Sequence, residues 1–263
     1  MKIAIIGAGN LGISIAEGIL HSNGATTMYM TRRDLSTIQD YEKYGNVVVT
    51  SDNREAVEAS DIIICCVQPA QFSAVLEESK DLLHENHLIL STITGFSINQ
   101  IEAIVGTTAA IVRSMPNTAI AVGNSMTCLC ANETGQKKID IAKAIFNRLG
   151  HTMEIQEELM QAATVICASG IAFWMRLIRA TTQGAIQLGF HAEEAQELAM
   201  HTCNGAASLL ISNGNHPEEE IDKVTTPMGC TIEGLNEMEH EGLSSSLIKG
   251  VVASYQKISE FRK

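Results

Sequence analysis

The sequence is poor in positive charge. Lysine and arginine number 18 against 30 aspartate and glutamate residues, which gives a formal net charge of −12. A broad basic surface of the kind that binds nucleic acid is therefore absent. The chain also lacks internal repeats and low-complexity segments, and its 263 residues allow one or two domains with a sizeable core. We expect no nucleic-acid partner, and an anionic ligand would have to be met by local positive groups.

Targeting and membrane-spanning signals are missing as well. The first residues run straight into an expected strand, without the basic segment, spacer and cleavage site of a signal peptide. The longest uncharged apolar run of the second half, residues 162–175, is shorter than the roughly 20 residues that cross a bilayer. These absences predict a soluble, cytoplasmic protein without a membrane partner.

No Cys-x-x-Cys motif occurs among the seven cysteines. Cys65 and Cys66 lie in an apolar run, and Cys128 and Cys130 alternate along another, as is typical of buried free thiols. The histidines are too isolated from further ligands to form a metal site. We therefore expect no bound metal.

The most informative motif is present at the start, where the apolar residues 3–6 run into Gly7-x-Gly9-x-x-Gly12. In dinucleotide-binding proteins the first glycine permits a tight turn and the second lets a pyrophosphate approach the backbone. The third lets the following helix pack against the strand. A helical pattern over residues 10–21 supplies the required strand–turn–helix context. Gly7, Gly9, Asn10, Leu11 and Gly12 are therefore predicted cofactor contacts, and the alternative is a glycine-rich turn without a ligand.

The residues after the second expected strand indicate which dinucleotide binds. NAD-binding proteins carry an acidic residue here for the ribose 2′-hydroxyl. This chain instead has Thr31, Arg32 and Arg33, a hydroxyl and two guanidinium groups that suit the 2′-phosphate of NADP. The alternatives are that the arginines are solvated loop charges, and that Asp34 faces the ribose or caps the next helix.

The first half alternates between strand and helix patterns and predicts an α/β, Rossmann-type doubly wound parallel sheet. Its strands are continuously apolar, because helices cover both faces of such a sheet. The expected strands are 3–6, 27–30, 47–49, 62–67, 88–91, 110–113 and 125–130. The expected helices are 10–21, 34–44, 53–59, 70–83, 98–104 and 136–149.

The second half contains no further convincing strand pattern after residue 155. Helices are expected at 157–188, 192–212, 217–224, 232–241 and 245–261. Several are apolar on more than one face, which indicates burial against another subunit. We therefore expect an NADP-binding Rossmann-like domain over residues 1–155 and an all-helical dimerisation and substrate domain over residues 156–263.

Several segments together resemble pyrroline-5-carboxylate reductases over nearly the whole chain. Besides the glycine motif they are Val67-Gln68-Pro69-Ala70-Gln71, Arg113-Ser114-Met115-Pro116-Asn117-Thr118, Ala168-Ser169-Gly170, residues 201–207 and residues 224–235. The resemblance implies hydride transfer from NADPH to C5 of the cyclic imine 1-pyrroline-5-carboxylate, which gives L-proline. It also implies homodimers intertwined through the helical domain, sometimes assembled into larger rings.

The resemblance also implies roles for single residues. Thr231 would hydrogen-bond the substrate near its ring nitrogen or carboxylate and is the catalytic candidate, with Gly229 and Cys230 cradling the carboxylate. The family places this substrate between the C-terminal domain and the nicotinamide. The residues implied to border the cofactor are Val67, Gln68, Pro69, Met115, Pro116 and Asn117.

The residues agree with such chemistry, because hydride transfer to a protonated imine needs positioning more than a strong acid or base. Three positions depart from the common family pattern: Gln68 stands for lysine, Ile171 for proline and Met228 for glycine. They leave open a reductase of another small imine or carbonyl acid, or a non-catalytic NADP-binding sensor. A 3-hydroxyacid dehydrogenase is disfavoured, because no lysine lies between Lys143 and Lys223. Arg113 and Thr118 could also be structural anchors.

Overall fold

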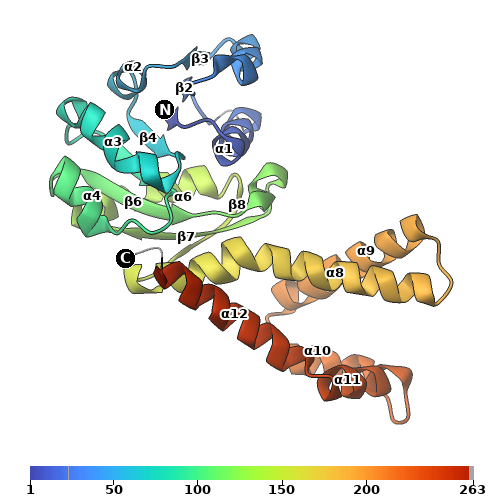
Figure 1. Ribbon diagram of the computed structural model, residues 1–263. Coiled ribbons are helices and arrows are strands. Elements are labelled where there is room, and N and C mark those ends of the chain that lie inside the picture. The colour runs from blue at the N-terminus through green and yellow to red at the C-terminus, as the bar shows by residue number, and fades with distance from the viewer. Residues whose placement is uncertain (23, 261–263) are drawn as a thin grey trace. The chain divides into compact units, whose positions relative to one another are not determined.

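The computed structural model describes residues 1–22 and 24–260 (Figure 1). The chain forms two compact units, one of residues 1–169 with the segment from Lys257 onward, and one of Gly170–Gln256. The expected helix end at Phe261 and the last residues of the expected second domain lie outside the described residues. Residues 157–169 belong to the first unit because Met160 and Val165 are buried there. The functional boundary at 155/156 stays a prediction.

An eight-stranded sheet forms the centre of the first unit, in the order β3-β2-β1-β4-β5-β6-β7-β8. The strands are β1 (Lys2–Ile6), β2 (Thr27–Thr31), β3 (Val47–Thr50), β4 (Ile62–Cys65), β5 (Leu88–Ser91), β6 (Ala110–Met115), β7 (Ser125–Ala131) and β8 (Gly150–Glu154). The strands β1 to β6 are mutually parallel, whereas β7 runs antiparallel to β6 and parallel to β8. The expectation that the strand at 125–130 continues a parallel sheet was therefore wrong. The short connection from β6 to β7 holds only a 3₁₀ helix, whereas a parallel neighbour needs a longer crossover.

Helices connect most of these strands. They are α1 (Asn10–His21), α2 (Asn53–Glu58), α3 (Pro69–Ser79), α4 (Ile98–Val105), α5 (Glu133–Gln136) and α6 (Ile139–Phe146), and α7 (Met160–Ala163) follows the last strand. The 3₁₀ helices are η1 (Leu35–Thr37), η2 (Gln39–Tyr44), η3 (Lys80–Leu82), η4 (Thr118–Val122) and η5 (Glu157–Leu159), and η6 (Thr164–Ser169) is a π-helix. The α-helix expected at 34–44 was wrong, since η1 and η2 replace it. Only Ile38 is buried in that segment, so no apolar stripe stabilises an α-helix.

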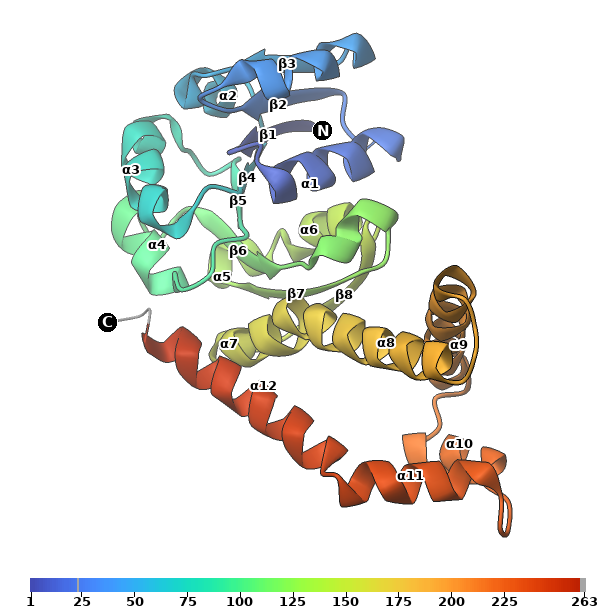
Figure 2. The ribbon, with the colours of Figure 1, turned by 45° about the vertical axis from the view of Figure 1, so that its right-hand side comes forward.

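The helices cover both faces of the sheet (Figure 2). Ile3 and Ile5 of β1 pack in one buried cluster with α1 and α6, whereas Ala4 and Ile6 pack in another with α2, α3 and α4. All four side chains are fully buried. The two covered faces explain the continuously apolar strands and confirm the predicted doubly wound α/β architecture.

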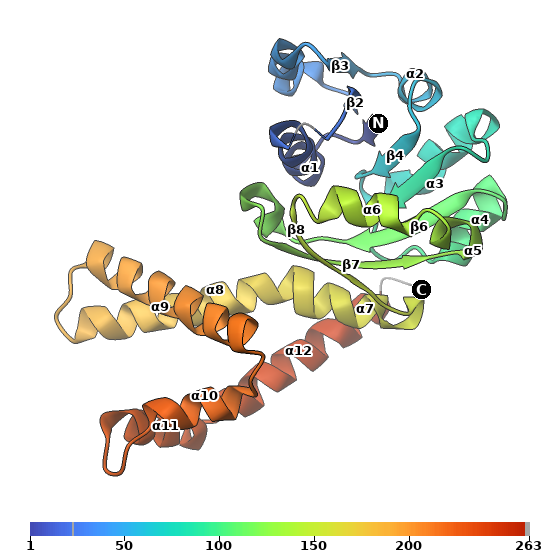
Figure 3. The same ribbon diagram turned by 180° about the vertical axis from the view of Figure 1, so that it is seen from behind.

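The second unit is entirely helical among its described residues, as predicted. Its helices are α8 (Gly170–Gln187), α9 (Ala192–Asn213), α10 (Pro217–Val224), α11 (Cys230–His240) and α12 (Leu243–Glu260), the last of which runs on beyond the unit. α8 and α9 lie side by side (Figure 3). Few side chains are buried there, and large apolar residues are exposed, among them Trp174, Met175, Leu188, Leu209, Ile211 and Ile248. The buried core of this unit is too small to cover these apolar side chains.

One continuous helical stretch, Glu157–Gln187, is longer than the apolar run counted in the sequence. By length and composition it is sufficient to cross a membrane: its most apolar 18 residues have a mean hydropathy of 1.4, and 22% of these residues are buried. The conclusion that this region is too short for a span was therefore wrong, because the helix continues through Arg176 and Arg179. Such a helix is weak evidence for a membrane span, because core helices of soluble proteins can have the same length and composition.

Candidate functional site

A cleft of about 670 Å³ opens in the first unit, where the carboxyl ends of β1 to β4 meet. The predicted residues that line it are Gly7, Gly9, Thr31, Arg32, Arg33, Val67 and Gln68. Ligands of open parallel sheets bind in the crevice at this edge, where the strand order reverses. The order here reverses at β1, which pairs with β2 on one side and β4 on the other.

Each glycine of the motif has a distinct structural role. Gly7 has φ +92°, and a Cβ atom there would lie 2.7 Å from Val67 Cγ1. A Cβ atom at Gly12 would lie 2.6 Å from the carbonyl oxygen of Gly7. Gly9 has no neighbour within 4 Å of the corresponding position. The fold therefore requires Gly7 and Gly12, whereas bare backbone at Gly9 leaves room for a ligand in the cleft.

Besides α2, whose N-terminus is capped by the side chain of Asp52, two helices begin at the cleft. α1 follows Gly9 and α3 follows Gln68, and neither N-cap residue makes a side-chain capping hydrogen bond. The first amide groups of a helix have no partner inside the helix and carry a partial positive charge. Together the two ends suit the diphosphate of a dinucleotide. Asn10, Leu11, Gly12 and Pro69 fall within the first turns of these helices and are not among the residues that line the cleft.

Thr31 holds the glycine turn in place from the end of β2. Its side chain is only 2% exposed, and its hydroxyl accepts a hydrogen bond from Gly7 N at 3.2 Å while donating to Asn53 Oδ1 at 2.8 Å. The hydroxyl thus has two partners within the protein, and its contact with a 2′-phosphate stays a prediction. Sequence reasoning missed Asn53, which lines the cleft and also donates to Glu78 at 3.3 Å. Its place just after β3, at the same sheet edge, was the available signal.

Arg32 and Arg33 bring positive charge to the cleft. Arg32 donates through Nη1 to the carbonyl oxygen of Ala8 at 2.9 Å, which uses one of the five donors of its guanidinium group. Arg33 is exposed. Asp34 caps η1, because its Oδ1 accepts from Ser36 N at 3.1 Å and from Ser36 Oγ at 2.7 Å. These bonds lower the pKa of Asp34 and keep it ionised. Asp34 was expected either to face the ribose or to cap the next helix, and the structure supports the cap.

The Met115-Pro116-Asn117 segment begins with the last residue of β6 and lies farther along the same edge of the sheet. These residues do not line the cleft described above. Asn117 Oδ1 accepts from Ala119 N at 2.9 Å, and Asn117 Nδ2 donates to the carbonyl oxygen of Cys167 at 3.1 Å. The segment is therefore held to both η4 and η6, and its place beside a cofactor stays a proposal.

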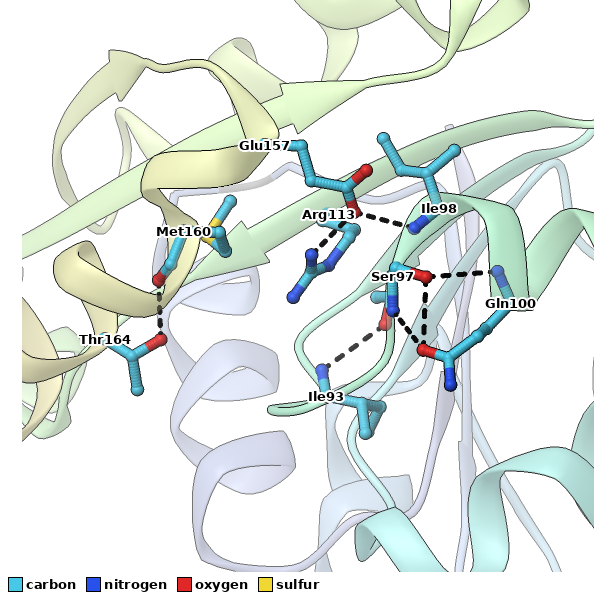
Figure 4. Close-up of polar contacts among 9 residues, drawn as sticks. Ile93, Ser97, Ile98, Gln100, Arg113, Glu157, Met160 and Thr164 are labelled. Carbon is cyan, nitrogen blue, oxygen red and sulfur yellow. Dashed lines mark hydrogen bonds and ion pairs between the residues drawn. The ribbon is translucent and has the colours of Figure 1, made fainter. Parts of the chain in front are cut away.

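Arg113 is a structural anchor (Figure 4). Its side chain is 3% exposed and forms an ion pair of 2.7 Å with Glu157. The same carboxylate oxygen accepts from Ile98 N at 2.7 Å, at the start of α4, where Ser97 and Gln100 form a capping box. A buried guanidinium requires such a partner, because an unpaired buried charge is strongly destabilising. Glu157 thereby fastens the beginning of the long helical stretch to the sheet, and the anchor alternative for Arg113 is confirmed.

The candidate substrate loop lies in the second unit. Gly229 caps α11 without a side-chain bond, and a Cβ atom there would lie 2.5 Å from Thr226 Oγ1. Met228 precedes it with φ 57° and is 97% exposed. The helix begins at Cys230, two residues earlier than predicted, so Thr231 stands in its first turn. Gly229, and not Thr231, is therefore the N-cap of α11.

Two further features concern the chemistry available. Cys66 lines the cleft, but burial raises the pKa of its thiol to about 12, so it is not a thiolate at neutral pH. Within residues 1–22 and 24–260, no group of three or more His, Cys, Asp or Glu side chains is arranged to hold a metal ion. The described cleft therefore offers backbone amides and guanidinium groups to a ligand.

A glycine turn, two helix N-termini without side-chain caps and two arginines at the switch point of a mostly parallel sheet are the features of a dinucleotide-binding protein. Family models for coenzyme F420-dependent NADP oxidoreductases and for pyrroline-5-carboxylate reductase dimerisation match residues 2–95 and 157–261, respectively. The chain is 46% identical to pyrroline-5-carboxylate reductase 1 of Dictyostelium discoideum over 97% of its own length and 49% of that protein. It is 42% identical to pyrroline-5-carboxylate reductase 2 of the same organism, over 98% of its own length and 92% of that protein. The chain belongs to the pyrroline-5-carboxylate reductase family.

Solved structures agree with this assignment. The pyrroline-5-carboxylate reductase of Coxiella burnetii superposes with a TM-score of 0.92 at 29% identity, covering 100% of this chain and 98% of that one. The pyrroline carboxylate reductase of Plasmodium falciparum, solved with NADP bound, gives a TM-score of 0.90 at 25% identity, with the same coverage.

Proposed function

We propose that this chain catalyses the NADPH-dependent reduction of 1-pyrroline-5-carboxylate to L-proline. The observation that carries the proposal is the cleft at the glycine turn, in a chain that is 42% identical to a full-length reductase. The chain spans about half the length of the other Dictyostelium relative, 49%.

We assign the cofactor to the cleft from the groups that line it. The diphosphate would lie against Gly9 and the first amides of α1 and α3, and the 2′-phosphate against Arg32 and Arg33. Val67 and Gln68 line the same cleft. The Met115-Pro116-Asn117 segment would border the nicotinamide. When bound, the reduced nicotinamide supplies the hydride for the reaction.

The substrate would be held at the start of α11. Its carboxylate suits the amides of Gly229, Cys230 and Thr231, because the N-terminus of a helix attracts anions. The Thr231 hydroxyl would hydrogen-bond the substrate near the ring nitrogen or the carboxylate. The protonated imine accepts a hydride at C5 and becomes a secondary amine. No side chain has to deliver a proton in that step, so positioning is the main task of these residues.

The family departures bear on which imine is reduced. At Met228 the backbone keeps the left-handed conformation that glycine adopts easily, at a cost of roughly 1 kcal/mol. The left-handed backbone conformation is therefore present without glycine, and the Met228 side chain is exposed. This observation favours a catalytic loop over the non-catalytic NADP-binding sensor. A reductase of another small imine or carbonyl acid remains the second candidate.

Steady-state oxidation of NADPH tests the activity. With racemic 1-pyrroline-5-carboxylate we expect saturable NADPH oxidation and formation of one equivalent of proline per NADPH consumed. A reaction without the imine is the control. NADPH binding without turnover would contradict the proposal in favour of the sensor, and turnover confined to other small imines would reassign the substrate.

We further propose that the chain is a cytoplasmic homodimer joined through its helical half. A family model for dimerisation matches residues 157–261, and this half exposes large apolar side chains that its own unit does not cover. Burial of these side chains against a second copy would remove apolar surface from water.

Light scattering checks the oligomer. In detergent-free buffer at micromolar concentration we expect at least twice the chain mass of 28.3 kDa. The same sample is then mixed with phosphatidylcholine vesicles and centrifuged, and we expect the protein to stay in the supernatant. A folded monomer, or sedimentation with the vesicles, would show that the apolar helices are covered by something other than a second copy.

A further inference from the structure

Two cysteines from distant parts of the sequence meet in the first unit. Cys128 lies in β7 and Cys167 in the π-helix η6, and their sulfur atoms are 3.8 Å apart and share a hydrogen bond. Both side chains pack in the buried cluster on the α3–α4 face of the sheet. We propose that Cys128 and Cys167 form a redox-active pair, which hydrogen peroxide converts to an intrachain disulfide and a dithiol reduces again.

The two thiols differ in exposure and in pKa, and these differences indicate which of them reacts first. Cys128 is 3% exposed, whereas Cys167 is half-buried and therefore the more accessible sulfur. The hydrogen bond from Cys128 lowers the pKa of Cys167, and the same bond and burial raise the pKa of Cys128. Only a thiolate reacts readily with peroxide, so Cys167 is oxidised first.

The chemistry balances without a further reactant. The Cys167 thiolate attacks one oxygen of hydrogen peroxide, forms a sulfenic acid and releases hydroxide, which takes up a proton to give water. The Cys128 sulfur then attacks the Cys167 sulfur, the S–O bond breaks, and the second hydroxide leaves as water with the Cys128 proton. Two thiols lose two electrons, and one peroxide is reduced to two waters.

One of the two cysteines lies in a segment whose backbone can shift. A disulfide requires sulfur atoms about 2.05 Å apart, so one of the two residues must shift. Cys128 is held in the sheet between Met115 of β6 and Met153 of β8. Cys167 lies in a π-helix, a conformation that occurs mostly as short irregular segments at functional sites. We therefore expect Cys167 to move, and its carbonyl oxygen to draw away from the amide of Asn117, which now donates to it at 3.1 Å.

Peptide mapping after mild oxidation tests the pair independently of any enzymatic activity. The full-length reduced protein is treated with a small molar excess of hydrogen peroxide, remaining thiols are alkylated, and the digest is examined by mass spectrometry. We expect a linked pair of peptides containing Cys128 and Cys167, loss of two alkylatable thiols per chain, and recovery of both with dithiothreitol. The Cys203→Ser variant, which removes a half-buried cysteine of α9, is expected to behave like the wild type.

Variants make the assignment sharper. Cys167→Ser and Cys128→Ala should each abolish the loss of two thiols, and circular dichroism establishes that each variant is folded. If Cys128→Ala does not fold, Cys167→Ser carries the test alone, because its side chain is only half-buried. Three outcomes would overturn the proposal. Cys167 could be linked to a cysteine other than Cys128, the first product could be an intermolecular disulfide through the exposed Cys230, or Cys167 could be over-oxidised without any linkage.

Discussion

Replacement of Arg32 and Arg33 together by alanine is expected to raise the KM for NADPH about 100-fold. Two charge-assisted hydrogen bonds to the 2′-phosphate would be lost, and together they contribute roughly 2.8 kcal/mol. Kinetics with NADH should remain nearly unchanged, because NADH has a hydroxyl at that position. The measurement is KM and kcat for both cofactors with 1-pyrroline-5-carboxylate.

The chain offers a matched control for this experiment. Arg54 is also a partly exposed arginine, but it forms an ion pair with Asp81 and does not line the cleft. Arg54→Ala should therefore leave the ratio of NADPH to NADH efficiency unchanged. Because Arg32 also binds the carbonyl oxygen of Ala8, the single variant Arg33→Ala separates phosphate contact from support of the glycine turn. Equal losses with both cofactors in the double variant would show that the arginines do not distinguish them.

Thr231→Ala is expected to lower kcat/KM for the imine about 100-fold while leaving NADPH affinity intact. A hydrogen-bond donor aimed at a reacting group commonly contributes a factor of this order. Gly229, not Thr231, caps α11, so the substitution should cost little stability. The measurements are steady-state kinetics, NADPH titration and thermal unfolding of the same preparation.

The conservative variant completes that test. Thr231→Ser keeps the hydroxyl and should recover most of the lost kcat/KM. A Thr231→Ala protein that melts at a clearly lower temperature but turns over at a near-normal rate would mean that Thr231 serves the fold, and the substrate site would then lie elsewhere.

Much of the fold could be predicted because its signals are local. The strand β1, the glycine turn and α1 follow one another within 21 residues, and close neighbours require glycine at Gly7 and Gly12. The helix α10 has the predicted bounds because Pro217 and three glutamates favour the start of a helix. The segment 34–44 was misjudged for the opposite reason, since no buried stripe supports the helical turns that its composition allows.

The cofactor cleft was predicted in part. Gly9, Arg32 and Arg33 line the cleft, as their places shortly after the first two strands predicted, and their contacts with a cofactor stay predictions. Asn53 was missed although it follows β3 closely, because its hydrogen bond with Thr31 joins residues 22 positions apart and only the folded sheet brings them together. The functional roles of Thr231, Gly229 and Cys230 rest on resemblance and on the position of a helix end, and they stay predictions.

The sequence by itself determined the class of the first half, the helical nature of the second, the glycine turn and the positive charge that follows β2. These depend on periodicity and on single-residue conformational preferences, which act over a few residues. Only the tertiary structure decided the direction of β7, the pairing of Arg113 with Glu157 and the approach of Cys128 to Cys167. Each depends on segments distant in sequence that are brought together by burial of the sheet, and burial is a property of the whole folded chain.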